Sequence, residues 1–210
     1  MTTVNTSHSA HHESAAAQIN GSALYIDDLP EVQGTLHAAP ILSPIAHGKV
    51  LGMHTEPALA CAGVHAIIGS GDIVGDQKFA SFSHDESIFA DTHVQHVGHV
   101  MGLVVADSHK HARVAARGVK ADIQALPAVL DVRQAYAQQH WVLPPVCVQR
   151  GDAAQAMASA PHVLQGSLDV GGQEHFYLEG QIAYAIPQDG GQWLIHSSTQ
   201  HPGEVQHWVA

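Results

Sequence analysis

The sequence is organised around one stretch, Gly171-Gly172-Gln173-Glu174-His175-Phe176-Tyr177-Leu178-Glu179. The paired glycines lack Cβ atoms, so the backbone there can pass close to a bulky group, and a carboxamide follows at once. Beyond them the apolar residues recur with a period of two. This predicts a strand over residues 175–186 with one apolar face, formed by Phe176, Leu178, Ile182, Tyr184 and Ile186. On spacing alone, a hairpin with a glycine bulge and a mixed polar surface would show the same pattern.

The composition favours a folded chain that binds neither nucleic acid nor a membrane. Of its 210 residues, 45% are hydrophobic, which is enough for one large domain or for a domain and a fragment. The chain has 8 Lys plus Arg against 19 Asp plus Glu, and its formal net charge of −11 argues against a phosphate-backbone partner. The polar N-terminus has no apolar signal core, and no apolar run is long enough to span a bilayer. A cytoplasmic location is expected.

The cysteines and histidines give no metal signature. Cys61 and Cys147 sit in apolar surroundings and are expected to be buried free thiols in a reducing compartment. Without a Cys-x-x-Cys pair, the chain is not expected to hold an iron–sulfur cluster or a structural zinc through cysteine. The 19 histidines are interpreted as compositional bias. Within them, His93, His96 and His99 lie three apart in a strand-like run, where such neighbours face opposite sides.

Patterning predicts a compact first unit that follows a polar tail. Residues 1–13 lack periodicity, which indicates disorder, and residues 14–131 then alternate between short strands and helices over about one domain length. The expected strands cover residues 22–26 after an Asn20-Gly21 turn, 34–39, 48–54, 64–68 and 121–124, with a hairpin or bent strand over 94–106. Helices are expected to begin at Thr55 and after Asp107-Ser108, and residues 70–86 should form a long loop.

The rest of the chain predicts a linker and an incomplete second unit. Residues 132–161 are expected to cross the surface and to contain a short helix over 152–158. Strands are expected over 162–170, 175–186 and 192–197, with Asp189-Gly190 as a hairpin turn and a helix that begins at Pro202. Such a small sheet with one helix does not bury its own apolar faces. The second unit is therefore expected to need more chain or a partner.

Several blocks resemble one known family. The central stretch is similar to the first cofactor-facing segment of the molybdenum hydroxylases, in the molybdopterin-binding subunit of their xanthine dehydrogenase branch. Further similar blocks follow the family order: Asn20-Gly21-Ser22-Ala23-Leu24-Tyr25-Ile26-Asp27-Asp28-Leu29-Pro30, Gly102-Leu103-Val104-Val105-Ala106-Asp107, Leu126-Pro127-Ala128-Val129 and Ser197-Ser198-Thr199-Gln200-His201-Pro202. One departure is Val97-Gly98-His99, where the family usually has Val-Gly-Gln.

The resemblance implies a fold class, a domain order and a set of cofactors. The class is α+β: an α/β hammerhead domain over residues 14–131, a linker over 132–161, and the truncated start of a molybdopterin-binding α+β domain over 162–210. The implied cofactors are molybdenum–molybdopterin in the intact subunit, and iron–sulfur clusters and FAD on partner domains or subunits.

The resemblance also singles out Gln173 as the cofactor-binding residue. The matching glutamine of the family donates a hydrogen bond from its side-chain amide to an oxygen ligand of molybdenum, so it is not itself a direct metal ligand. A neutral carboxamide suits this role because it donates without adding charge and cannot titrate. The alternative is a glutamine that caps a strand end. No catalytic residue is assigned within the chain, because the family's catalytic glutamate lies near the end of the subunit.

The implied function is that of a purine-hydroxylating oxidoreductase, acting on a carbon of xanthine or hypoxanthine together with an iron–sulfur/FAD subunit. The chain alone is expected to be inactive. Two alternatives stay open: a fragment of an aldehyde or carbon monoxide oxidising subunit, and a non-catalytic hammerhead interaction domain whose histidines bind metal incidentally.

Overall fold

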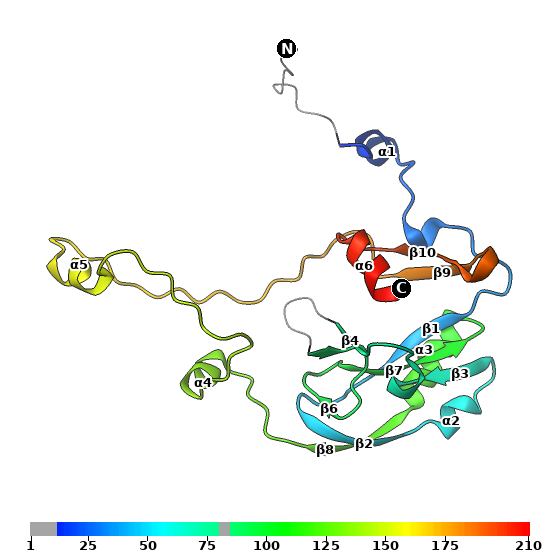
Figure 1. The fold of residues 1–210 in the computed structure, drawn as a ribbon. Coiled ribbons are helices and arrows are strands. Elements are labelled where there is room, and N and C mark those ends of the chain that lie inside the picture. The colour runs from blue at the N-terminus through cyan, green and yellow to red at the C-terminus, as the bar shows by residue number, and fades with distance from the viewer. Residues whose placement is uncertain (1–11, 80–84) are drawn as a thin grey trace, which may run out of the picture. The chain divides into compact units, whose positions relative to one another are not determined.

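The computed structural model describes residues 12–79 and 85–210 and shows mixed helix and strand (Figure 1). The chain forms two compact units, Leu36–Glu174 and the combination of Met1–Thr35 with His175–Ala210. The predicted α+β class is confirmed. The predicted domain boundaries follow the sequence blocks and not these compact units, and they stay a prediction.

The unit Leu36–Glu174 contains most of the regular structure. Its elements are β1 (His37–Leu42), β2 (Gly48–His54), α2 (Glu56–Leu59), β3 (Val64–Ile68), the 3-10 turn η2 (Ser70–Asp72), β4 (Lys78–Phe79), β5 (Glu86–Ser87), β6 (His93–Val94), β7 (Val100–Ala106), α3 (His109–Gly118), β8 (Lys120–Ala125), α4 (Val132–Ala137) and α5 (Ala153–Ser159).

Two three-stranded antiparallel sheets form the body of this unit. One has the strand order β1-β7-β3 and the other the order β6-β2-β8, while β4 and β5 pair separately. The central strand β7 places Gly102 opposite Ile41. A Cβ atom at Gly102 would lie 2.6 Å from the carbonyl oxygen of Ile68, so only glycine lets β3 approach β7 this closely.

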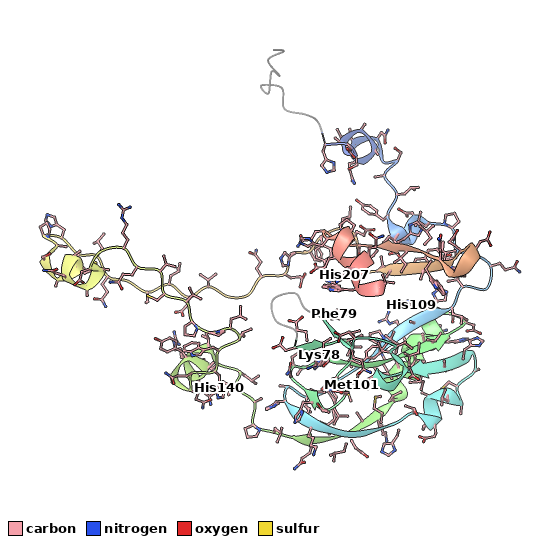
Figure 2. All side chains as sticks on the ribbon, viewed as in Figure 1. Lys78, Phe79, Met101, His109, His140 and His207 are labelled. Atoms are coloured by element: carbon pink, nitrogen blue, oxygen red, sulfur yellow. The ribbon has the colours of Figure 1, made fainter. Side chains whose placement is uncertain are left out.

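Helix α3 closes the core of this unit. Ser108 caps it by accepting a hydrogen bond from the backbone N–H of His111, as the sequence predicted. The helix packs on β1 and β7 through the buried Ala112, Ala115 and Ala116, whose small side chains allow a close approach. The largest fully buried side chains are those of Met101, Val94 and Val104, and Met101 is labelled in Figure 2.

The second unit consists of terminal segments and one hairpin. Its elements are α1 (Ala15–Asn20), η1 (Ile26–Asp28), β9 (Ala183–Pro187), η3 (Asp189–Gly191), β10 (Trp193–Ser197) and α6 (Pro202–Val209). Strands β9 and β10 pair antiparallel, and Gly190, at φ +71°, turns the chain between them. The predicted hairpin turn at Asp189-Gly190 is therefore confirmed, as is the helix that begins at Pro202.

Several predicted strands are wrong or shorter than expected. The Asn20-Gly21 signal ends helix α1, with Gly21 at φ +76° as its left-handed cap, and no strand forms over residues 22–26. Residues 162–170 form no strand. The segment 175–186, predicted as one strand, is extended and paired only at its end, where β9 (Ala183–Pro187) begins. The earlier part of that segment has no neighbouring strand among the described residues to pair its backbone, and Phe176 adopts φ +51°.

The remaining corrections concern local features. Helix α4 was not predicted, although Asp131 caps it by accepting a hydrogen bond from the backbone N–H of Gln134. Both cysteines are free, but Cys61 and Cys147 are exposed, because an apolar sequence neighbourhood does not make a surface position buried. The expected loop 70–86 includes short paired strands, and its residues 80–84, like the expected tail up to residue 11, lie outside the described part of the chain.

Candidate cofactor-facing site

Gln173 lies in a segment without regular secondary structure, directly after Gly171 and Gly172. Its side chain is exposed and forms no hydrogen bond with any residue that the structure describes. A Cβ atom at either glycine would meet no atom within 4 Å, so the chain itself leaves the space around this segment open. The amide of Gln173 thus has no partner among the described residues, and it caps no strand end.

The residues that follow are anchored by Glu179. The side chain of Glu179 is half-buried, and its Oε1 accepts a hydrogen bond of 3.0 Å from the backbone N–H of Ile26, 153 positions earlier in the sequence. Ile26 is the first residue of η1, whose N-terminal N–H groups have no partner within the turn itself. Glu179, the last residue of the block 171–179, is therefore joined to Ile26 of the block 20–30, and both residues belong to the same compact unit.

Tyr184 makes a second connection between the C-terminal hairpin of this unit and its N-terminal segment, here at residues 32–35. Its hydroxyl oxygen accepts a hydrogen bond of 2.8 Å from the backbone N–H of Val32 and lies 3.4 Å from Oγ1 of Thr35. The ring of Tyr184 also stacks on that of His196, with 6.1 Å between the ring centroids. The sequence had assigned Tyr184 only to an apolar face, because contacts across such a separation leave no local signal.

The polar residues near the site do not form an acid–base set. Gln181 donates a hydrogen bond of 2.6 Å to the hydroxyl of Tyr177, whose ring lies 6.4 Å from that of His175. The carboxylate of Glu179 is engaged by a backbone N–H group. These contacts order the segment but bring no nucleophile and base together. In the part of the chain that the structure describes, no group of three or more His, Cys, Asp or Glu side chains could hold a metal ion.

One histidine pair has distinctive electrostatics, away from Gln173 in the sequence. The rings of His96 and His99 stack with centroids 4.6 Å apart, because Gly98 at φ +82° bends the segment that was expected to alternate as a strand. Burial lowers the pKa of His99 below its usual value, and the neighbouring His96 lowers it further. Nδ1 of His99 accepts a hydrogen bond of 3.2 Å from the N–H of Gln95, which also favours the neutral ring.

Comparison with known families assigns both parts of the chain. Residues 20–127 match the family model described as "Aldehyde oxidase and xanthine dehydrogenase, a/b hammerhead domain". The chain belongs to the aldehyde oxidase and xanthine dehydrogenase family. Residues 136–210 of this family member match a second model, described as "Molybdopterin cofactor-binding domain". The resemblance read from the sequence blocks is confirmed.

Curated relatives and solved structures agree with this assignment. The chain is 38% identical over 202 residues to a xanthine dehydrogenase of Calliphora vicina. It is 36% identical over 200 residues to the xanthine dehydrogenase/oxidase of Mus musculus. Each alignment covers 95% of this chain and 15% of the relative. It is similar to the aldehyde oxidoreductase of Desulfovibrio gigas, with a TM-score of 0.74 at 31% identity over 88% of this chain and 23% of that one. It is also similar to quinoline 2-oxidoreductase of Pseudomonas putida 86, with a TM-score of 0.79 at 25% identity over 96% and 28% of the two chains.

These findings fix the cofactor class of the family. The hammerhead domain followed by the start of a molybdopterin-binding domain is confirmed, and molybdenum–molybdopterin, iron–sulfur clusters and FAD are the cofactors that the homologues use. The donor chemistry at Gln173 fits an oxygen ligand of molybdenum, since an exposed carboxamide donor with no partner among the described residues stands beside open glycines.

The chain spans 15% of the length of the curated relatives named above. Among residues 12–79 and 85–210, no helix has the length and apolarity that crossing a membrane would require.

Proposed function

We propose that this chain is part of a molybdenum-cofactor subunit that hydroxylates purines such as xanthine or hypoxanthine. The observation that carries the proposal is the succession of the two family models over residues 20–127 and 136–210, in a chain whose curated relatives are xanthine dehydrogenases. The intact enzyme works with an iron–sulfur/FAD subunit in the cytoplasm. The chain alone is inactive.

Gln173 is the residue of this chain that faces the cofactor. Its side-chain amide would donate a hydrogen bond to an oxygen ligand of molybdenum, and Gly171 and Gly172 would leave room for the pterin. When bound, the molybdenum cofactor supplies the redox chemistry of the hydroxylation. The protein contributes orientation and electrostatics, because a neutral donor holds the cofactor without changing the charge of the site. Glu179 and Tyr184 tie the segment that follows Gln173 to residues 26–35.

A second candidate function is the oxidation of an aldehyde. It is favoured by the similarity to the Desulfovibrio gigas aldehyde oxidoreductase, which reaches 31% sequence identity. A non-catalytic hammerhead interaction domain is the alternative from another class. It predicts that the intact protein contains no molybdenum, whereas both enzyme proposals predict molybdenum in stoichiometric amount.

The substrate is tested with the intact enzyme that contains this chain. Its molybdenum content is measured first, and kcat/KM is then compared for xanthine, hypoxanthine and a set of aldehydes. We expect stoichiometric molybdenum and the highest kcat/KM with a purine. Higher kcat/KM with an aldehyde would replace the purine proposal by the aldehyde proposal, and a molybdenum-free protein would overturn both.

A further inference from the structure

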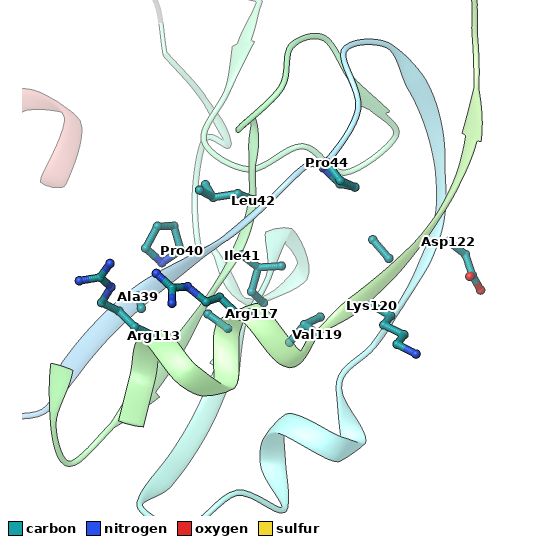
Figure 3. Close-up of a pocket in the computed structure, with 12 residues that line it drawn as sticks. Ala39, Pro40, Ile41, Leu42, Pro44, Arg113, Arg117, Val119, Lys120 and Asp122 are labelled. Atoms are coloured by element: carbon teal, nitrogen blue, oxygen red, sulfur yellow. The ribbon is translucent and has the colours of Figure 1, made fainter. Parts of the chain in front are cut away.

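A groove with an apolar floor and cationic sides lies between β1 and the end of α3. Its volume is about 720 Å³, and Figure 3 shows the side chains around it. Strand β1 provides the floor with four residues. Pro40 and Leu42 line the groove with exposed side chains, and Ala39 and Ile41 line it with side chains that also enter the core. The side chain of Leu42 is 52% exposed, so a large apolar surface in this groove faces solvent.

Three of the chain's 8 Lys and Arg residues line this groove. Arg113, Arg117 and Lys120 all line it, although the whole sequence has only 8 Lys plus Arg and a net charge of −11. All three side chains are exposed, and none forms an ion pair with a residue that the structure describes. Asp122 also lines the groove, but its carboxylate lies 2.8 Å from Nε2 of His54.

Arg113 and Arg117 repel each other on α3, which disfavours the helix when no ligand is bound. Arg113 and Arg117 stand one turn apart on α3, where like charges repel, and Figure 3 shows both side chains along the same edge of the groove. A basic residue in the last turn of a helix is favourable for the helix dipole, which accounts for Arg117. It does not account for Arg113 in the middle of α3 or for Lys120 in β8. A negatively charged ligand across the groove would relieve this repulsion.

We propose that this groove docks an acidic segment of a partner polypeptide that also carries apolar side chains. Carboxylates of the segment pair with Arg113 and Arg117, and its apolar side chains cover Pro40 and Leu42. The apolar floor distinguishes such a segment from a small anion, to which it offers no hydrogen-bond donor. The strongly negative chain disfavours a nucleic acid, whose long phosphate backbone needs a wider basic surface.

The test measures the binding of a fluorescein-labelled peptide of alternating aspartate and leucine to the full 210-residue chain by fluorescence anisotropy. The double variant R113Q/R117Q should bind roughly 10-fold more weakly, because two partly exposed ion pairs are lost. The control R133Q/R150Q removes the same charge from exposed positions outside the groove and should bind like the original chain. Leu42→Ser should also weaken binding, since it removes apolar surface without opening the core.

Each variant is checked by thermal unfolding, so that a loss of binding is not a loss of fold. The proposal is supported if R113Q/R117Q and Leu42→Ser both weaken binding while the control does not. It is overturned if the peptide does not bind, or if the control weakens binding as much as R113Q/R117Q. It is also overturned if inorganic pyrophosphate or a thymidine oligonucleotide competes with the peptide and Leu42→Ser has no effect, because the site would then select charge alone.

Discussion

The region between β1 and α3 and the region after β8 have similar apolar segments and very different packing. Every buried residue that the structure describes lies between Ala39 and Ala116, whereas residues 126–182 contain none. In the second region Val142, Leu164 and Phe176 are 98%, 101% and 93% exposed. Apolar alternation thus shows which side of a segment is suited to burial, but a neighbouring element must be present before burial occurs.

Strand β7 and residues 162–170 illustrate the difference. Both are apolar-rich and both were expected to be extended, but β7 lies between β1 and β3 with α3 over its face. Residues 162–170 have no such neighbours in the described part of the chain and adopt no regular structure. The first region should therefore respond to core substitutions, and the second should tolerate the same substitutions.

The largest contrast is expected from truncating one methionine in each region. Met101 is 1% exposed and Met157 is 59% exposed. Met101→Ala should lower the free energy of unfolding by roughly 2–5 kcal/mol, because it leaves a cavity in the core. Met157→Ala should change it by less than about 0.5 kcal/mol. Urea unfolding of both variants measures the difference, and equal effects would show that the two regions are packed alike.

A smaller contrast is expected at two glycines. Gly102→Ala places a Cβ atom 2.6 Å from the backbone carbonyl oxygen of Ile68, and backbone cannot move aside as a side chain can. We expect a loss of roughly 1–3 kcal/mol from this overpacking. At Gly166 an added Cβ atom meets nothing within 4 Å, so Gly166→Ala should be neutral. An unchanged melting temperature for Gly102→Ala would mean that β3 can separate from β7 at no cost.

The smallest effect is expected in the pH dependence of stability at His99. Burial and the charge of His96 lower its pKa in the folded state. As pH falls through about 6.5, the unfolded chain therefore takes up the proton first, and the free energy of unfolding decreases until the lower folded pKa is passed. His99→Gln keeps an acceptor for the N–H of Gln95 and should flatten this dependence between pH 7 and 5.

The control for this measurement is His140→Gln, which changes an exposed histidine of the second region. Its unfolding curves should keep the pH dependence of the original chain. If His99→Gln retained the full dependence as well, His99 would not be the group that destabilises the fold in acid.

The sequence predicted those parts of the fold whose signals are local. Residues 48–54 and 64–68 form strands with the predicted bounds, and Ser108 begins α3 as its capping residue indicated. The exposure of Phe176 could not be predicted, because it depends on whether another element packs on it, and none of the described residues does. Glu179 was missed for a related reason: its backbone partner, Ile26, is 153 positions away.

The candidate site was predictable only through resemblance. Period-two alternation around Gln173 favoured a strand end, and the structure has no strand there. The order of the sequence blocks identified the family, which the matches over residues 20–127 and 136–210 then confirmed. No physical pattern in the sequence distinguishes a carboxamide that faces a cofactor from one that faces water.

The central claim is that Gln173 faces the molybdenum cofactor, and substituting it in the intact enzyme tests this most directly. Gln173→Ala should leave thermal stability unchanged, because the side chain is exposed and has no hydrogen-bond partner among the described residues. Molybdenum content or the rate of enzyme reduction by substrate should fall by roughly 10–100-fold. Gln173→Glu should be worse than alanine, because it brings a negative charge toward an electron-rich oxygen ligand. Both variants with the original molybdenum content and turnover would contradict the assignment.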